Sequence, residues 1–244
     1  KVTGSFDNPA GFAGCLCAGI PFLFFYSKYP NKRIRWGSYV ALFIISTAVF
    51  FSESRAGIVS LLIIIYSFFI HPYTKGWKIK TAILSLVLCF TLSYCYSVKK
   101  DSANGRLYIW RCTWEMIKDK PFIGHGIGGF NAHYMDYQAA YFKQNPNSKF
   151  QILADNIKHP FNEYLKIGTQ YGIIGWGVLV LLGVFLAYCY KRSPSFESYI
   201  CLLSLLSIAT FSFFSYPFTY PFIWIIKYKH SNKKRIRQYP IHKK

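Results

Sequence analysis

Residues 171–190 read YGIIGWGVLVLLGVFLAYCY, a stretch without a single charged side chain. A helix needs about 20 apolar residues to cross ~30 Å of hydrocarbon, so this stretch predicts a transmembrane helix. Similar runs, one of them short, occur at residues 10–27, 36–52, 56–70, 81–98 and 198–215. We therefore expect an all-α fold, a polytopic transmembrane helical bundle.

The composition agrees with this class of protein. The 244 residues are 52% hydrophobic and 20% aromatic, with a mean hydropathy of +0.20, which is too apolar for an ordinary soluble domain. A further apolar segment near Phe222 is too short to cross a membrane. The chain starts at Lys1 rather than Met and has no cleavable signal pattern, so we expect a fragment of a longer membrane protein.

The basic residues predict the orientation. More than half of the 29 lysines and arginines fall in segments that share one side when the six spans alternate: residues 28–35, 75–80, 191–192 and 227–244. Because such residues accumulate in cytoplasmic loops, that side is cytoplasmic and residues 99–170 face outward. The net charge of +20 then needs no nucleic-acid partner, and attraction to anionic membrane lipids also suits the basic tail.

The predicted organisation has four parts. Residues 1–98 hold about four spans, and residues 99–170 form an extracytoplasmic loop with most of the acidic residues and the candidate catalytic motifs. Residues 171–228 hold about two spans and the short terminal hydrophobic segment, and residues 229–244 form a basic cytoplasmic tail. The chemistry is expected in the long loop.

Residues 106–118 of the loop predict an amphipathic helix, because apolar side chains recur three and four positions apart. These side chains are Leu107, Trp110, Trp114 and Ile117. We expect Ser102 or Asn104 to cap the helix and Pro121 to end it. Such a helix would lie along the outer membrane surface with its tryptophans among the lipid headgroups.

Residues 124–129, GHGIGG, match the glycine spacing of a dinucleotide-binding loop. That fingerprint also needs a preceding strand, a following helix and an acidic residue about twenty positions on, inside a βαβ unit, and this chain lacks that pattern. We interpret the stretch as a turn. Its backbone N–H groups either approach a phosphate or only let the chain reverse, and we favour the plain turn.

The expected outward histidines, His125, His133 and His159, do not have the compact spacing of metal ligands, and the seven cysteines lie mostly in apolar runs. We expect no metal site and no disulfide framework. His159 differs from the others because it precedes a span by a few residues, beside Asn162 and Glu163. An imidazole at the depth of a lipid headgroup suits general-base chemistry near neutral pH.

Two arginines are candidates for binding an anion. Arg55 follows the second span with Glu53 beside it, and Arg106 opens the amphipathic helix. An ionisable residue at a membrane boundary is costly unless it is paired or functional. Both guanidiniums in one outer vestibule would suit a diphosphate. Two plainer interpretations stay open, a Glu53–Arg55 pair in a tight turn and an Arg106 that only reaches lipid phosphate.

Five motifs occur in a fixed order on the expected outer side. They are GSFDNP at 4–9, SRAG at 54–57, GR at 105–106 with Trp110, PFIGHG at 121–126, and HPFNEYL at 159–165 with YGIIG at 171–175. Together they resemble the O-antigen ligase and polymerase superfamily, over nearly the whole chain. The family motif often has Asn directly after the histidine, whereas Pro160 and Phe161 intervene here.

The resemblance implies a metal-independent inverting glycosyltransferase of the bacterial inner membrane that needs no cofactor. It would transfer a glycan from undecaprenyl diphosphate to an acceptor at the outer face, during the synthesis of cell-surface polysaccharide. Arg55 and Arg106 would hold the carrier diphosphate, and His159 would take the proton of the acceptor hydroxyl. These three are the candidate catalytic residues.

Three further residues are candidates for substrate binding under the same resemblance. Trp110 would stack on a sugar or on Arg106, while Asn162 and Glu163 would orient His159.

The acceptor distinguishes the members of the superfamily. It is lipid A core in a ligase, a growing glycan in a polymerase and a protein hydroxyl in an oligosaccharyltransferase. We favour the ligase, with the polymerase next.

Two other classes of protein stay open. A transporter of lipid-linked glycan would bind the diphosphate but would not need His159, and a non-catalytic membrane scaffold would need none of the three candidate catalytic residues.

Overall fold

The computed structural model describes residues 9–69, 77–98 and 100–219, and the regular structure of these residues is entirely helical. The elements are α1 (Pro9–Ser27), α2 (Lys32–Phe51), α3 (Arg55–Phe69), α4 (Trp77–Val98), α5 (Lys100–Asp119), α6 (Gly129–Gln144), the 3-10 helix η1 (Lys149–Leu153), α7 (Glu163–Arg192), α8 (Phe196–Ser212) and the 3-10 helix η2 (Pro217–Thr219). The all-α prediction is confirmed for this part of the chain. The 4–8 segment of the first motif, the apolar segment near Phe222 and the basic tail lie outside the described residues.

Each of the six predicted apolar runs falls on a helix, namely α1, α2, α3, α4, α7 and α8. Of these, α1, α2 and α7 are long and apolar enough to cross a membrane, whereas α3 and α8 are apolar but shorter. Large apolar side chains lie exposed on several of the helices, including Phe43 (74% exposed), Phe90 (73%) and Leu181 (69%). Apolar surface of this extent is unfavourable in water and suits a lipid surrounding.

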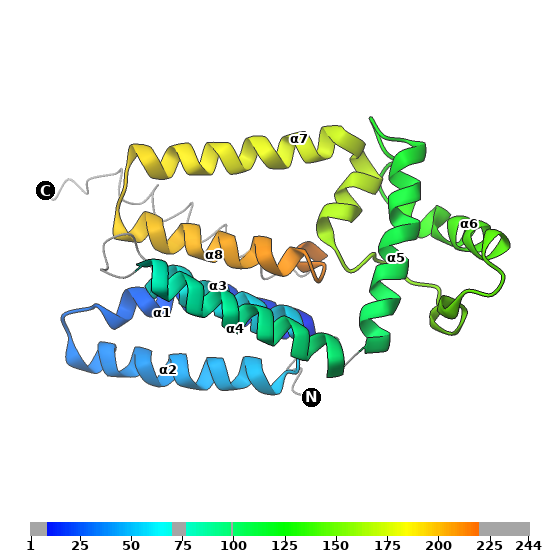
Figure 1. Cartoon of the computed structure of the whole chain (residues 1–244). Coiled ribbons are helices and arrows are strands. Elements are labelled where there is room, and N and C mark those ends of the chain that lie inside the picture. Colours follow the sequence, from blue (N-terminus) through cyan, green and yellow to red (C-terminus); the bar gives the residue numbers. More distant parts are fainter. Residues whose placement is uncertain (1–8, 70–76, 99, 220–244) are drawn as a thin grey trace, which may run out of the picture.

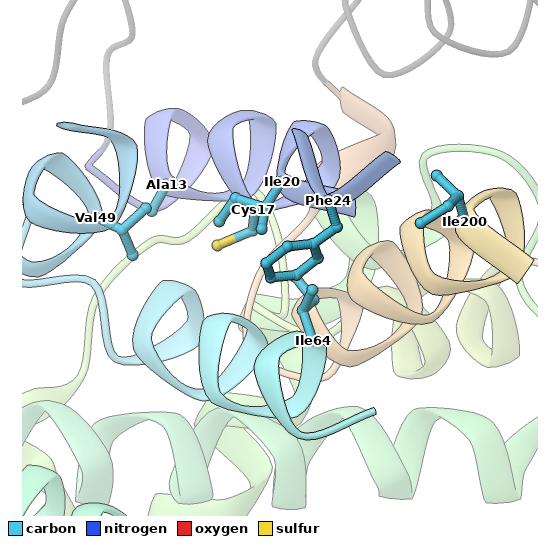
Figure 2. Close-up of a cluster of buried hydrophobic side chains, with 7 residues drawn as sticks. All are labelled: Ala13, Cys17, Ile20, Phe24, Val49, Ile64 and Ile200. Atoms are coloured by element: carbon cyan, nitrogen blue, oxygen red, sulfur yellow. The ribbon is translucent and has the colours of Figure 1, made fainter. Parts of the chain in front are cut away.

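Helix α1 is the centre of the bundle, since it packs against α2, α3 and α8. Figure 2 shows the core that these four helices share, made of Ala13, Cys17, Ile20, Phe24, Val49, Ile64 and Ile200. Small residues allow the close packing. A Cβ on Gly57 would lie 2.6 Å from Ala13 Cβ, and one on Gly14 would lie 2.8 Å from the ring of Phe211.

The predicted loop gathers at one end of the bundle. In Figure 1, α1–α4, α7 and α8 run roughly along one direction, α5 crosses them at one end, and α6 lies on the far side of α5. The α1–α2 and α7–α8 connections lie at the opposite end. The basic 28–35 and 191–192 segments lie at or beside these connections. The orientation in the membrane stays a prediction.

The structure corrects the prediction for α5 in one respect. The helix begins at Lys100, so Ser102 and Asn104 lie inside it and do not cap it. Of the predicted apolar stripe, Leu107 and Trp114 are about half exposed and Ile117 is buried, and the placement of the helix on the membrane surface stays a prediction. The other buried side chains of the helix are Tyr108, Ile109, Cys112, Thr113 and Met116.

These further side chains of α5 are buried because the helix packs against a helix that the sequence analysis did not predict. Aromatic side chains from α6 and η1 form a second hydrophobic core on α5, where Tyr108 stacks on Phe142 and Phe150 with ring centroids 5.3 and 5.4 Å apart. Helix α6 escaped prediction because its polar and aromatic residues do not form a clear apolar stripe. The 99–170 segment therefore has a core of its own.

Helix α7 bends at Gly172, whose φ is +59°. A Cβ there would lie 2.4 Å from the carbonyl oxygens of Pro121 and Phe122. The glycine-rich turn docks on this bend, because His125 N donates to Thr169 O (2.7 Å) and Gly126 N donates to Gln170 O (3.0 Å). The stretch forms the predicted turn, and the N–H groups of His125 and Gly126 are used within the protein.

We predict that Gly172→Ala destabilises the protein strongly. The positive φ alone costs about 1–3 kcal/mol for a residue with a side chain, and the new methyl group also meets backbone oxygens that cannot rotate away. The matched control is Gly177→Ala on the same helix, where an added Cβ meets no atom within 4 Å. Thermal unfolding in detergent should show a lower midpoint for Gly172→Ala alone, and equal midpoints would contradict the packing described here.

Candidate active site

Arg55 is held at the first position of α3 by its local sequence. The Ser54 hydroxyl accepts a hydrogen bond from Gly57 N (3.1 Å) and so caps the helix. Arg55 Nη2 then donates to the hydroxyl of Ser102 on α5 (2.9 Å). The residue thereby connects a bundle helix to the helix that crosses the end of the bundle.

Arg106 lies one turn after Ser102 on α5, so the two residues share a face of the helix. Its Nη1 donates to the carbonyl oxygen of Phe214 (2.7 Å), and its guanidinium lies 5.3 Å from the centroid of the Phe161 ring. Burial and the nearby charge of Arg55 lower the pKa of Arg106 to about 10. The predicted pair of arginines is therefore brought within electrostatic reach, and the region remains cationic at neutral pH.

The segment before α7 is fixed by backbone and side-chain contacts. Trp110 Nε1 donates to the carbonyl oxygen of Pro160 (2.9 Å), and Asn162 caps α7 by accepting from Leu165 N (3.1 Å). Between them, Phe161 has a φ of +53°, a backbone conformation that costs about 1–3 kcal/mol in a residue with a side chain. The ring of Phe161 packs on Arg106 and on Tyr216.

His159 packs against Tyr216, with ring centroids 4.7 Å apart and planes inclined by 35°. Burial lowers the pKa of His159 below its usual 6.5, and the charges of Lys166 and Lys158 lower it further. The imidazole is consequently neutral at neutral pH, which is the form that accepts a proton.

Tyr216 connects the histidine to the arginines. It contacts His159 and Phe161, and Phe161 in turn packs on Arg106. The sequence analysis missed this residue. The available signal was its place directly after the last apolar run on the expected outer side, where tyrosine is common at membrane interfaces.

Asn162 and Glu163 are both buried, and their contacts are structural. The capping bond occupies Asn162 Oδ1, while one oxygen of Glu163 accepts from Lys166 Nζ (2.9 Å) and the other is buried without a partner. Among the described residues, no hydrogen bond links either side chain to His159. Trp110 likewise has a structural contact, because its N–H holds the carbonyl oxygen of Pro160. The aromatic ring that packs against Arg106 belongs to Phe161. Substrate contacts of these three residues stay predictions.

The other two histidines of the loop lie together. The rings of His125 and His133 have centroids 5.3 Å apart, and His125 Nε2 donates to the carbonyl oxygen of Met116 (2.8 Å). His125 therefore helps to hold the glycine-rich turn against α5.

A pocket of about 260 Å³ opens beside His159. Its lining comes from the start of α6, from the segment before α7 and from the first turns of α7 itself. The lining residues are Gly128, Phe130, Asn131, Lys158, His159, Lys166 and Gln170.

Comparison with known proteins agrees with this class of α-helical membrane protein. The sequence matches the family model described as O-antigen ligase over residues 39–180. It is also 30% identical over 104 residues to a Rickettsia typhi protein named "Putative polysaccharide ligase", a match that covers 41% of this chain and 22% of that protein. The chain thus spans about a fifth of the length of this relative.

The fold and the candidate site define an integral membrane protein with two neighbouring arginines at one end of its helices. The chain belongs to the O-antigen ligase family, because the family model covers more than half of it. The resemblance drawn from the five motifs is confirmed at the level of the family.

We predict that Trp110→Phe loosens the segment that carries His159. The substitution keeps an aromatic ring but removes the N–H that donates to Pro160 O, and a lost hydrogen bond of this kind costs about 1 kcal/mol. The control is Trp114→Phe on the same helix, where the indole is half exposed and stacks on Trp176. Limited proteolysis should cleave the 154–162 segment faster in Trp110→Phe only. Equal cleavage in both variants would contradict the positioning role.

Proposed function

We propose that this protein transfers a glycan from undecaprenyl diphosphate to an acceptor at the outer face of the bacterial inner membrane, as a ligase-type enzyme. Three observations carry the proposal. Arg106 packs on Phe161, His159 packs on Tyr216, and these two aromatic rings contact each other. Arg55, from a third segment, lies within electrostatic reach of Arg106. The names of the family and of the Rickettsia typhi relative favour a ligase over a polymerase.

The proposed chemistry follows from the charges of the site. Arg55 and Arg106 repel each other, and a diphosphate between them would relieve that repulsion. As His159 accepts the proton of the acceptor hydroxyl, the oxygen attacks the anomeric carbon from the face opposite the diphosphate. The glycosidic phosphate bond breaks with inversion, and the arginines stabilise the charge on the departing diphosphate. In this scheme no metal ion takes part.

The orientation in the membrane is part of the proposal. The basic connections at residues 28–35 and 191–192 lie at the end of the bundle opposite the site. Since basic loops stay in the cytoplasm, the site would face the periplasm.

The central test measures transfer by the full-length protein in native membranes. Removing the general base with His159→Ala should slow transfer about 10²–10⁴-fold. We expect Arg55→Ala and Arg106→Ala to cost about 10²-fold or more, and Arg106→Lys to recover only part of this loss because lysine has no planar fork.

Two matched controls belong to this test. Arg111→Ala removes an arginine of α5 that packs on Tyr141, and His133→Ala removes a half-exposed histidine of α6, so both variants should transfer glycan at the normal rate. Normal transfer by His159→Ala would sink the general-base role. If no acceptor is glycosylated while the carrier still crosses the bilayer, the protein is a transporter.

The pH dependence provides a second prediction. Because burial and two lysines disfavour the imidazolium, the folded pKa of His159 lies below 6.5, and the active neutral form persists at slightly acidic pH. The rate should stay level above pH 6.5 and fall only as the pH drops through this lowered pKa. Lys158→Gln removes one source of the lowering and should move the acid limb to higher pH. An acid limb centred above 6.5 in the wild type would contradict this assignment.

A further inference from the structure

The pocket beside His159 lies in a different neighbourhood from the two arginines. Arg106 contacts Phe161 and Phe214, whereas the pocket is lined from α6 and from one face of α7, where Lys166 and Gln170 are one turn apart. His159 belongs to both neighbourhoods, because its ring packs on Tyr216 and also lines the pocket.

The pocket is positively charged. Lys158 and Lys166 line it, and its lining contains no acidic side chain. The positive charge of Lys166 is offset by Glu163, with which it forms a 2.9 Å ion pair. Lys158 therefore supplies the main positive charge of the pocket. A concave site of one sign of charge concentrates ligands of the opposite sign.

The rest of the lining suits a sugar. The amides of Asn131 and Gln170 can each donate to and accept from hydroxyl groups, and Phe130 adds an apolar wall. With about 260 Å³, the pocket lies just below the ~300–1,000 Å³ of sites for drug-sized ligands, which is room for one sugar residue rather than a chain.

Building on the proposed transfer reaction, we propose that this pocket is the acceptor subsite and takes a terminal sugar that carries a carboxylate or phosphate group. Lys158 binds the anionic group, aided by Lys166, and Asn131 and Gln170 bind hydroxyls. A neighbouring hydroxyl of the same sugar then faces His159.

Two considerations assign the pocket to the acceptor rather than to the donor. The base must touch the attacking hydroxyl, and His159 is the proposed base that lines the pocket, while the diphosphate is assigned to the arginines. In addition, Lys166 and Lys158 lower the pKa of His159, so an anion bound to them would offset their effect and make the imidazole a stronger base as the acceptor arrives.

Binding is tested with single sugars on the full-length protein in lipid nanodiscs, by saturation-transfer NMR. The probes are galacturonic acid and galactose 6-phosphate, with galactose as the neutral control. We expect both anionic sugars to bind at least about tenfold more tightly than galactose, in line with one charge-assisted hydrogen bond. Lys158→Gln should abolish this preference and Lys158→Arg should retain it.

The matched control is Lys149→Gln, which removes an exposed lysine of η1 outside the pocket and should leave binding unchanged. Equal binding of galactose and the anionic sugars would overturn the subsite, as would unchanged binding in Lys158→Gln. If the anionic sugars depend on Arg55 instead of Lys158, they occupy the diphosphate site and the proposal is wrong.

Transfer assays separate this inference from the proposed function. If the anionic sugars bind through Lys158 but the wild type transfers no glycan to any acceptor, the anionic subsite stands and its assignment to an acceptor falls with the proposed function. If the wild type transfers glycan equally well to neutral and anionic acceptors and Lys158→Gln changes neither rate, the transfer function stands and the subsite is overturned.

Discussion

The bend of α7 at Gly172 is the constraint on which the arrangement of the site depends. The carbonyl oxygens of Pro121 and Phe122 occupy the space of a side chain at this position, so the turn after α5 and the start of α7 are locked together. This contact fixes the first turns of α7, and with them Lys166, Gln170 and the segment that presents His159. At the other end of α5, the hydroxyl of Ser102 accepts a hydrogen bond from Arg55. One transverse helix therefore sets the distance between the candidate base and the candidate diphosphate site.

The sequence was sufficient to predict the helical class and the positions of the apolar helices, because charge-free runs of nearly fixed length have few other interpretations. It also offered His159, Arg55 and Arg106 as candidates, from their places beside the apolar runs and from the order of the motifs, without their geometry. The glycine-rich turn was interpreted correctly, because the sequence around it contradicts a dinucleotide site.

The sequence could not show which element packs against each face of a helix. Helix α5 has apolar residues on more than one side, and only the presence of α6 determines that Tyr108 and Met116 are buried while Leu107 is exposed. Tyr216 was not predicted for a similar reason, since the sequence does not show which side chains a single aromatic residue after an apolar run will contact. The capping by Asn162 could have been expected from its place before α7, but the resemblance drew attention to a role beside the histidine instead.

The contact between Arg106 and the carbonyl oxygen of Phe214 has a consequence for how the site is made. A chain is synthesised from its N-terminus, so Arg55, Arg106 and His159 all emerge before the residues that complete their surroundings. Phe214 and Tyr216 follow α8, and Arg106 is not in its final environment until that helix has been inserted. The site is therefore assembled late in biogenesis, and a nascent chain that stops short of α8 carries all three candidate catalytic residues without the order that would make them active.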